Sequence, residues 1–179
     1  MTVIAYIGLG ANLGDAVATL RAATTAIGRL PHTRLIATSS FWRSAPVGCA
    51  VAQPDFVNAV VEIDTTLSPG ALLDHLFQIE AAFGRERPFA NAPRTLDLDL
   101  LLFSHFVLDS PKLTLPHPRL HLRAFALLPL LELAPEISLP GRGAAAAWLP
   151  AVASQSLEKL SGEMADVPDP PQEPILSRT

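Results

Sequence analysis

Residues 92–103 read APRTLDLDLLLF, a segment in which acidic and aliphatic residues alternate. Side chains in a β-strand alternate between the two faces of a sheet, so Asp97 and Asp99 share one face. The leucines beside and between them then point toward a hydrophobic core on the other face. The segment therefore predicts a half-buried strand that carries two neighbouring carboxylates.

The two carboxylates indicate a divalent metal and phosphate chemistry. They repel each other, and hard oxygen ligands suit Mg²⁺, which usually binds together with phosphates. Arg94 lies three residues before Asp97, where it would face the same polyanion. The alternative is that Asp-x-Asp is only the solvated face of a strand. The nearby Arg85, Arg87 and His117 favour the functional interpretation.

Turn and capping signals on both sides of this strand predict the order βαββαβ. The residues before it give five elements: a strand over 2–8, a helix from Asp15 to Gly28, a strand over 33–43, a strand over 56–64 and a helix from Ser68 to Gly84. Loops occupy 44–54 and 84–93. The predicted fold class is α+β, with a ferredoxin-like βαββαβ core whose antiparallel sheet carries two helices on one face.

The C-terminal part predicts additions to this core. Residues 107–115 are expected to add a hairpin to the sheet, and the apolar helix 122–134 should cover the second face. Together they would make a three-layer αβα sandwich. Residues 144–149 and 153–160 are expected to be short helices. Residues 1–162 are therefore predicted to form one domain, with 163–179 as a disordered C-terminal tail.

Composition and charge narrow the class of protein. The chain has 179 residues, 49% of them hydrophobic and 17% charged, which is typical of a globular domain. Its net charge of −4 argues against a nucleic-acid binder. Residues 84–123 nevertheless hold six basic against four acidic side chains. A basic segment in an acidic protein suits a small anionic ligand.

The sequence gives no sign of a secreted or membrane protein. Cys49 is the only cysteine, so no intramolecular disulfide can form. The N-terminus lacks the features of a signal peptide, and no apolar run is long enough to span a bilayer. We expect a cytoplasmic protein that does not contact membranes.

Two common nucleotide-binding motifs and one nucleophile motif do not fit. The glycines Gly8, Gly10 and Gly14 depart from GxGxxG by one residue, and the strand over 33–43 offers no acid for a ribose. No GxxxxGK[ST] or nucleophile-elbow motif is present. The glycines are expected to make a tight strand-to-helix turn.

Aromatic and polar residues elsewhere suggest a second half of the site. Phe56 and Asn58 share a strand face and could stack on and hydrogen-bond a flat heterocycle. The alternative is a core phenylalanine beside an edge asparagine, and Phe125 has the same ambiguity. His117 lies between two prolines and is either a fixed ligand contact or an exposed turn residue. Arg119, together with Arg123, could form a basic wall opposite the aspartates.

Six segments in this order resemble the 6-hydroxymethyl-7,8-dihydropterin pyrophosphokinase family. They are YIGLGANLGD, SSFWRSAPVG, QPDFVNAVVEI, IEAAFGRER, APRTLDLDLLLF and LTLPHPRLHLRAFALLPLLELAP, between about residues 3 and 140. The resemblance implies transfer of a pyrophosphoryl group from ATP to the pterin alcohol, giving AMP and the pterin diphosphate, a step of folate biosynthesis. The implied partners are these two small molecules alone, and the protein is expected to be a monomer.

The resemblance also implies roles for residues. The implied catalytic residues are Arg85, Arg94, Asp97 and Asp99, of which Asp97 and Asp99 would hold two Mg²⁺ ions. The implied pterin-binding residues are Ser44, Ala45, Val47, Phe56, Asn58 and Phe125, with Phe56 and Phe125 enclosing the ring. The implied ATP-binding residues are Glu80, Arg85, Arg94, Leu100, Lys112, Thr114, His117 and Arg123.

The sequence departs from the family in the loop 87–93. The loop is one residue shorter than in some members, and Asn91 stands where a tryptophan often closes over the pterin, with Phe89 as a possible replacement. Two other functions stay open on the residues alone. One is a ferredoxin-like sensor that binds a small ligand without turnover, and the other is a kinase that transfers a single phosphoryl group.

Overall fold

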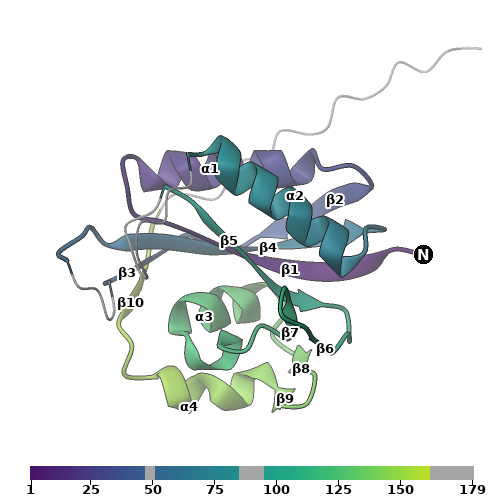
Figure 1. The fold of residues 1–179 in the computed structure, drawn as a ribbon. Helices are drawn as coiled ribbons and strands as arrows, with labels where there is room; N and C mark the ends of the chain where they lie inside the picture. Colours follow the sequence, from purple (N-terminus) through teal and green to yellow (C-terminus); the bar gives the residue numbers. More distant parts are fainter. Residues whose placement is uncertain (47–50, 85–94, 162–179) are drawn as a thin grey trace, which may run out of the picture.

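The fold is built around one six-stranded antiparallel sheet, shown in Figure 1. A computed structural model describes residues 1–46, 51–84 and 95–161. The strands follow the order β10-β3-β4-β1-β5, and β2 also pairs with β4. Their bounds are β1 Val3–Ala11, β2 Thr33–Thr38, β3 Trp42–Ser44, β4 Phe56–Thr65, β5 Asp97–Phe103 and β10 Leu157–Lys159. The long central strand β1 therefore lies between β4 and β5.

Two capped helices cover one face of the sheet. In α1 (Ala16–Gly28), the Asp15 carboxylate accepts a hydrogen bond from the N–H of Ala18 at 3.0 Å. In α2 (Pro69–Ala82), the Ser68 hydroxyl accepts from the N–H of Ala71 at 3.2 Å. Each cap satisfies an N–H that the helix itself leaves without a partner, and both predicted helix starts are confirmed.

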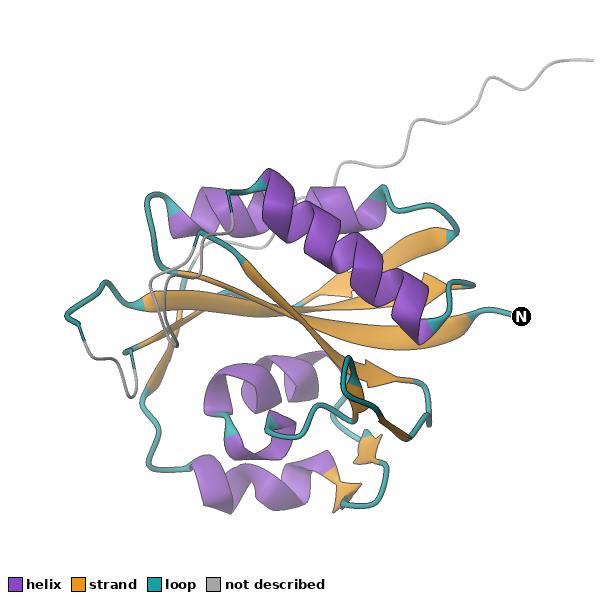
Figure 2. Ribbon diagram, in the orientation of Figure 1, coloured by secondary structure: helices purple, strands orange, loops and turns teal. Residues whose placement is uncertain are grey.

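Helices on both faces of the sheet give three layers (Figures 1 and 2). Leu20 of α1 and Leu76 of α2 belong to the core on the first face. The core on the second face contains Leu127 and Leu130 of α3 (Ala124–Leu133). The short α4 (Leu149–Val152) lies beside α3 on that second face. A central sheet between two helical layers was predicted, and the apolar helix does cover the second face.

Strand β5 has the two-faced character that its sequence predicts. Leu96, Leu98 and Leu100 are buried in the first core, and the two aspartates between them are half-buried on the opposite face. Beyond them the pairing with β1 shifts by one residue, because Ile7 pairs with Leu100 and Tyr6 with Leu102. The extra residue, Leu101, packs in the second core. Such a bulge re-aims the side chains that follow it.

The predicted strand over 33–43 is wrong, because it is two strands. The hydroxyl of Ser39 accepts a hydrogen bond from the N–H of Val60 at 2.9 Å, in the place of a backbone carbonyl. The N–H of Ser40 turns away from the sheet to the Glu132 carboxylate, at 2.8 Å. The chain therefore leaves the ladder, and β2 and β3 pair with different parts of β4.

Three C-terminal predictions also need correction. Residues 153–160 are not a helix, because Leu157–Lys159 form β10 and pair with β3. The hairpin of β6 (Leu108–Asp109) and β7 (Thr114–Leu115) forms but pairs only with itself, as a separate two-stranded sheet. The apolar helix begins two residues later than predicted, after the 3₁₀ turn η1 (Leu120–Leu122).

The remaining elements are short. The 3₁₀ turn η2 (Ala145–Trp148) runs into α4, so short helices do follow residue 144 as predicted. Strands β8 (Ser138–Leu139) and β9 (Gly143–Ala144) form a second small hairpin. Among the helices of the described ranges, none is long and apolar enough to cross a membrane.

Candidate active site

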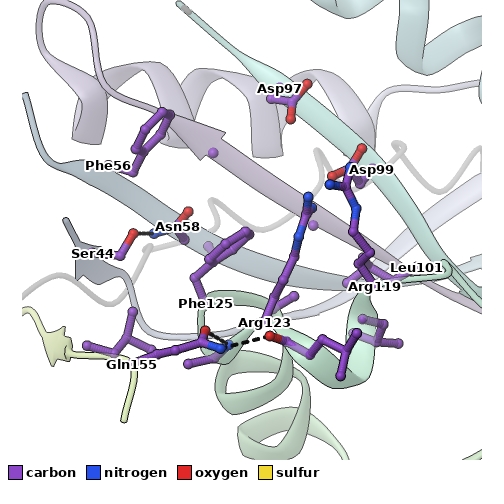
Figure 3. Close-up of a pocket in the computed structure, with 18 of the residues that line it drawn as sticks. Ser44, Phe56, Asn58, Asp97, Asp99, Leu101, Arg119, Arg123, Phe125 and Gln155 are labelled. Atoms are coloured by element: carbon purple, nitrogen blue, oxygen red, sulfur yellow. Dashed lines mark hydrogen bonds between the residues drawn. The ribbon is translucent and has the colours of Figure 1, made fainter. Parts of the chain in front are cut away.

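A cavity of about 580 Å³ opens on the second face of the sheet, between strands β1, β4 and β5 and the start of α3 (Figure 3). This volume is in the usual range for a small-molecule site. The segment 154–157, which precedes and begins β10, closes a further side. The aspartates of β5 lie at one end of this cavity, and Phe56 and Asn58 of β4 lie at the other (Figure 3).

Two glycines of β1 form the floor between these ends. Gly10 pairs with Asn58 of β4 on one side and with Asp97 of β5 on the other, and Gly8 pairs with Asp99. A Cβ atom on Gly10 would lie 3.4 Å from the Asn58 side-chain oxygen. The absence of side chains here keeps the space between the amide and the carboxylates open. The prediction that these two glycines form a turn is wrong, because both lie inside β1 and only Gly14, with φ of +61°, lies beyond it.

The acidic end confirms the predicted placement of the carboxylates. Asp97 and Asp99 both line the cavity. Arg119, which directly precedes η1, and Arg123, which lies between η1 and α3, extend toward them from the other side of the cavity (Figure 3). The predicted basic wall therefore lies opposite the two aspartates, although these two arginines are far from β5 in sequence. An anion held in this space would face the arginine side chains on one side and the aspartate carboxylates on the other.

His117 lines the cavity beside these arginines. Burial, together with the positive charges of Arg123 and Arg119, lowers the pKa of His117 to about 4, against a smaller opposing effect of Asp97. Its Nδ1 accepts a hydrogen bond from the N–H of Arg119 at 3.2 Å. His117 is therefore neutral at pH 7, with Nε2 as the nitrogen that can donate to a ligand.

The aromatic end brings together residues from three elements. Phe56 on β4 and Phe125 on α3 both extend into the cavity (Figure 3). Asn58, 4% exposed, donates from Nδ2 to the Ser44 hydroxyl at 2.8 Å and to the Trp42 carbonyl at 3.3 Å. These bonds fix the orientation of the carboxamide at the wall of the cavity. Ala45 also lines this end.

The two ends are physically connected through α3. The guanidinium carbon of Arg123 lies 5.4 Å from the centre of the Phe125 ring, within the range of a cation–π interaction.

A hydrogen bond also connects two motifs of the sequence, because the buried Asn12 donates to the Gln53 side chain at 2.7 Å. That contact places the end of the loop before Phe56 against the end of β1.

Several residues implied by the resemblance lie away from this cavity. Glu80 and Leu100 are buried on the first face, 1% and 2% exposed. The ammonium of Lys112 lies 2.6 Å from the Asp74 carboxylate on α2, and Thr114 lies on β7. None of these four is among the described residues that line the cavity. The remaining implied residues, Val47, Arg85 and Arg94, lie outside the described residues, as do the loop positions Arg87, Phe89 and Asn91.

The sequence did not point to the wall formed by residues 154–157. Gln155 lines the cavity and makes two hydrogen bonds to the backbone at the start of α3 (Figure 3). A single glutamine in a segment predicted to be helical carries no pattern from which such long-range contacts could be foreseen. The open floor at Gly8 and Gly10 could have been recognised, because glycine in a strand often marks a close approach by a ligand.

The carboxylates fit a metal that is shared with substrate. Among the described residues, no group of three or more His, Cys, Asp or Glu side chains could hold a metal ion by itself. Mg²⁺, however, is usually bound by one or two carboxylates together with substrate phosphates and water. The pair Asp97 and Asp99, facing an open cavity, is a donor set of that kind.

The comparisons with known proteins all point to the same family. Residues 6–135 match the family model of 7,8-dihydro-6-hydroxymethylpterin-pyrophosphokinase. The 2-amino-4-hydroxy-6-hydroxymethyldihydropteridine pyrophosphokinase of Pseudomonas aeruginosa is 45% identical over 88% of this chain and 96% of its own length. The enzyme of the same name from Haemophilus influenzae is 47% identical over 77% of this chain and 86% of its own.

Solved structures support the same fold. A crystal structure of Plasmodium falciparum HPPK-DHPS with pterin and p-hydroxybenzoate matches with a TM-score of 0.68 at 17% identity. The match covers 84% of this chain but 43% of the Plasmodium chain, so this chain spans less than half of that protein. With the family model and these sequence relatives, we conclude that the chain belongs to the 7,8-dihydro-6-hydroxymethylpterin-pyrophosphokinase family, whose members transfer a pyrophosphoryl group from ATP to hydroxymethyldihydropterin in folate biosynthesis.

Proposed function

We propose that this cavity transfers the pyrophosphoryl group of ATP to the hydroxymethyl oxygen of 6-hydroxymethyl-7,8-dihydropterin, releasing AMP and the pterin diphosphate. The observation that carries the proposal is that one cavity joins two different ends. An aromatic and amide end suits a flat heterocycle, and an end with two carboxylates and two arginines suits a metal-bound polyphosphate. The open glycine floor connects them.

The pterin is assigned to the aromatic end. Phe56 and Phe125 would stack on the ring, and Asn58 would hydrogen-bond its edge. Ser44 orients the Asn58 carboxamide, which reduces the conformational entropy lost on binding. Ala45, and Val47 on the strength of the family resemblance, complete the assigned pterin contacts.

The phosphates are assigned to the other end. Asp97 and Asp99 would hold Mg²⁺, two ions by the family resemblance, with the ATP phosphates completing the coordination. When bound, Mg²⁺ supplies charge neutralisation and lowers the pKa of the attacking hydroxyl. Arg123 and the neutral His117 would contact the phosphates from the opposite wall. Arg119, which was not among the implied ATP residues, joins them because it lines the same wall.

The remaining assignments rest on the family resemblance. Arg85 and Arg94 are assigned to the transferring and leaving phosphates, where they would stabilise developing charge. Four further residues are assigned to ATP: Glu80, Leu100, Lys112 and Thr114. The buried positions of Glu80 and Leu100 favour an indirect role for their side chains, through the placement of β5.

The chemical step needs no nucleophile from the protein. The hydroxymethyl oxygen attacks the β-phosphorus, the bond from that phosphorus to the α-phosphate oxygen breaks, and AMP leaves. The protein contributes position and electrostatic stabilisation, which are the main sources of catalysis in phosphoryl transfer. Covering the cavity would exclude water, the competing nucleophile. A site that did not exclude water would hydrolyse ATP.

The wider organisation is inferred in the same way. The strand order β5-β1-β4, followed by β2 and β3, supports the ferredoxin-like arrangement of the βαββαβ unit. We further infer one domain over residues 1–162, acting as a monomer in the cytoplasm on small molecules, without nucleic acid.

The experiment that tests the proposal is a product assay. The protein is incubated with ATP, Mg²⁺ and the reduced pterin, and nucleotides and pterins are separated by chromatography. AMP and the pterin diphosphate should appear in equal amounts, and chelating Mg²⁺ should stop their formation. ADP with a pterin monophosphate would indicate an ordinary kinase. Binding without turnover would indicate a ligand sensor.

A further inference from the structure

Gln155 lies at a point where the C-terminal part of the chain contacts the cavity. It follows α4 and precedes β10, in the segment 154–157 that lines the cavity. This segment lies beyond residues 6–135, which match the family model. The side chain of Gln155 is exposed on the cavity wall and reaches toward the start of α3 (Figure 3).

The Gln155 carboxamide binds the backbone on both sides of Arg123. Its Oε1 accepts a hydrogen bond from the N–H of Ala124 at 2.9 Å. Its Nε2 donates to the carbonyl of Leu122 at 2.8 Å. Ala124 is the first residue of α3, where the helix offers no internal partner for the N–H, and Arg123 makes no side-chain cap there. Gln155 therefore caps α3 from 31 residues away in sequence.

These two bonds fix the backbone that carries residues of both substrate ends. Arg123 lies between the two bonded groups, and Phe125 follows the capped N–H directly. The two side chains also contact each other, because the guanidinium carbon of Arg123 lies 5.4 Å from the centre of the Phe125 ring. A shift of residues 122–124 would therefore move the phosphate contact and the ring contact together.

The same segment is also fixed to the opposite wall. Leu157 of β10 pairs with Ser44 of β3, and the Ser44 hydroxyl accepts the hydrogen bond from Asn58. Residues 155–157 thus connect the wall that carries Phe125 to the wall that carries Asn58. This short connection acts beside the bonds from Ser40 and Trp42 to Glu132, which also join α3 to the sheet.

We infer that Gln155 is a positioning residue of the pyrophosphoryl transfer, which holds Arg123 and Phe125 in register through the backbone of residues 122–124. The inference rests on the proposed function of the cavity. Both polar atoms of the carboxamide are engaged by backbone groups, which is why the role is indirect. Loss of the two bonds should loosen both substrate contacts without removing either side chain.

The test is the substitution Gln155→Met, which keeps the length of the side chain and removes both hydrogen bonds. We expect kcat/KM for the pterin to fall about tenfold. A change of this size corresponds to the net free energy of roughly one hydrogen bond in water. The dissociation constant of the pterin, from its fluorescence, should rise by a similar factor. The matched control is Gln78→Met on the exposed side of α2, which should leave both quantities unchanged.

A double-mutant cycle separates positioning from a purely structural role. In a Phe125→Ala background, Gln155→Met should weaken pterin binding much less than in the wild type, because there is no ring left to position. A lower Tm with unchanged pterin affinity and kcat/KM would overturn the inference, as would equal effects in both backgrounds. If Gln155→Met does not fold, Gln155→Glu serves instead, since it keeps the acceptor for Ala124 and should show a smaller loss of the same kind.

The inference and the proposed function fail in different ways. If the wild type forms AMP and the pterin diphosphate and Gln155→Met does so with equal kcat/KM, the inference alone is wrong. If the wild type forms neither product, the proposed function is wrong.

Discussion

The Glu80 carboxylate accepts a hydrogen bond from the backbone N–H of Leu98 at 2.8 Å, at the residue between Asp97 and Asp99. Glu80 is 1% exposed and lies on α2, on the face of the sheet opposite the cavity. The bond therefore joins the first helical layer to the strand that carries both aspartates. This buried bond holds β5 from behind while its acidic face stays open.

Replacing Glu80 with alanine should cost both stability and activity. The buried N–H of Leu98 would lose its acceptor, and we expect the free energy of unfolding to fall by about 2 kcal/mol. Urea denaturation measures this change. Gln78→Ala, an exposed position of the same helix, is the control and should change the free energy little. Unchanged stability of Glu80→Ala would show that β5 is held by other contacts.

Asp97→Asn should separate function from folding. The change keeps the shape of the side chain but removes one of two neighbouring charges, so repulsion with Asp99 falls. We expect activity to drop at least about 100-fold, as for loss of a major electrostatic contact in a site. The Tm should stay the same or rise. Asp109→Asn, at an exposed position on β6, is the control. A large loss of stability in Asp97→Asn would instead make Asp97 a structural residue.

His117 should make stability depend on pH in a defined window. Its pKa is about 4 in the folded protein and near 6.5 when unfolded, so between these values the unfolded chain binds more protons. The free energy of unfolding should therefore increase as the pH rises from about 4 to 6.5. The contribution of His117 to it should be lost as the pH falls through the same window. Urea denaturation of His117→Gln across the window should show a smaller slope than the wild type.

Part of the change in the free energy of unfolding with pH should remain in His117→Gln. Burial, together with the charge of Arg142, also lowers the pKa of His121, which packs edge-on against Trp148. Substituting both histidines should flatten the profile further. Identical slopes in the wild type and His117→Gln would contradict the burial of a neutral imidazole at position 117.

Glu132 should stabilise the second face in its ionised form. Burial raises the pKa of Glu132, but hydrogen bonds from Ser40 and Trp42 and the charge of Lys159 outweigh it, so the pKa lies below the usual value. A lowered folded pKa gives stability that is present above the unfolded pKa and lost as pH falls through the folded one. Glu132→Gln should therefore be less stable at pH 7, with the difference shrinking below about pH 4.5.

The control for Glu132 is an exposed ion pair. Glu158 lies 3.4 Å from Arg43 and its side chain is 67% exposed, so Glu158→Gln should change the free energy of unfolding by less than about 0.5 kcal/mol. Chemical denaturation at pH 7 and pH 4 compares the two variants. Equal effects of the two substitutions would show that the bonds around Glu132 contribute no more than a surface pair.

Local patterns were enough to predict the elements that place the carboxylates. The period of two in residues 96–100 identified the face of each side chain in β5, and Asp15 and Ser68 marked the starts of α1 and α2. These signals depend on neighbours in sequence, so they can be read without knowing the fold. The aspartates, Phe56 and Asn58 accordingly line one cavity.

The features that were missed depend on partners far away in sequence. Leu157–Lys159 are a strand because β3 offers an edge to pair with, and their own sequence has no strand pattern. The break at Ser39 depends on the N–H of Val60, and the cap of α3 depends on Gln155. Each of these is a single polar contact over a long separation, which leaves no periodic trace.

The transfer of two phosphoryl units as one group is the central claim, and the position of an isotopic label tests it most directly. ATP labelled at the β-phosphorus is incubated with the protein, Mg²⁺ and 6-hydroxymethyl-7,8-dihydropterin. Attack at the β-phosphorus predicts that all transferred label is found in the pterin diphosphate and none in the AMP that is released. Label retained in ADP, or released as inorganic phosphate without the pterin, would contradict the account.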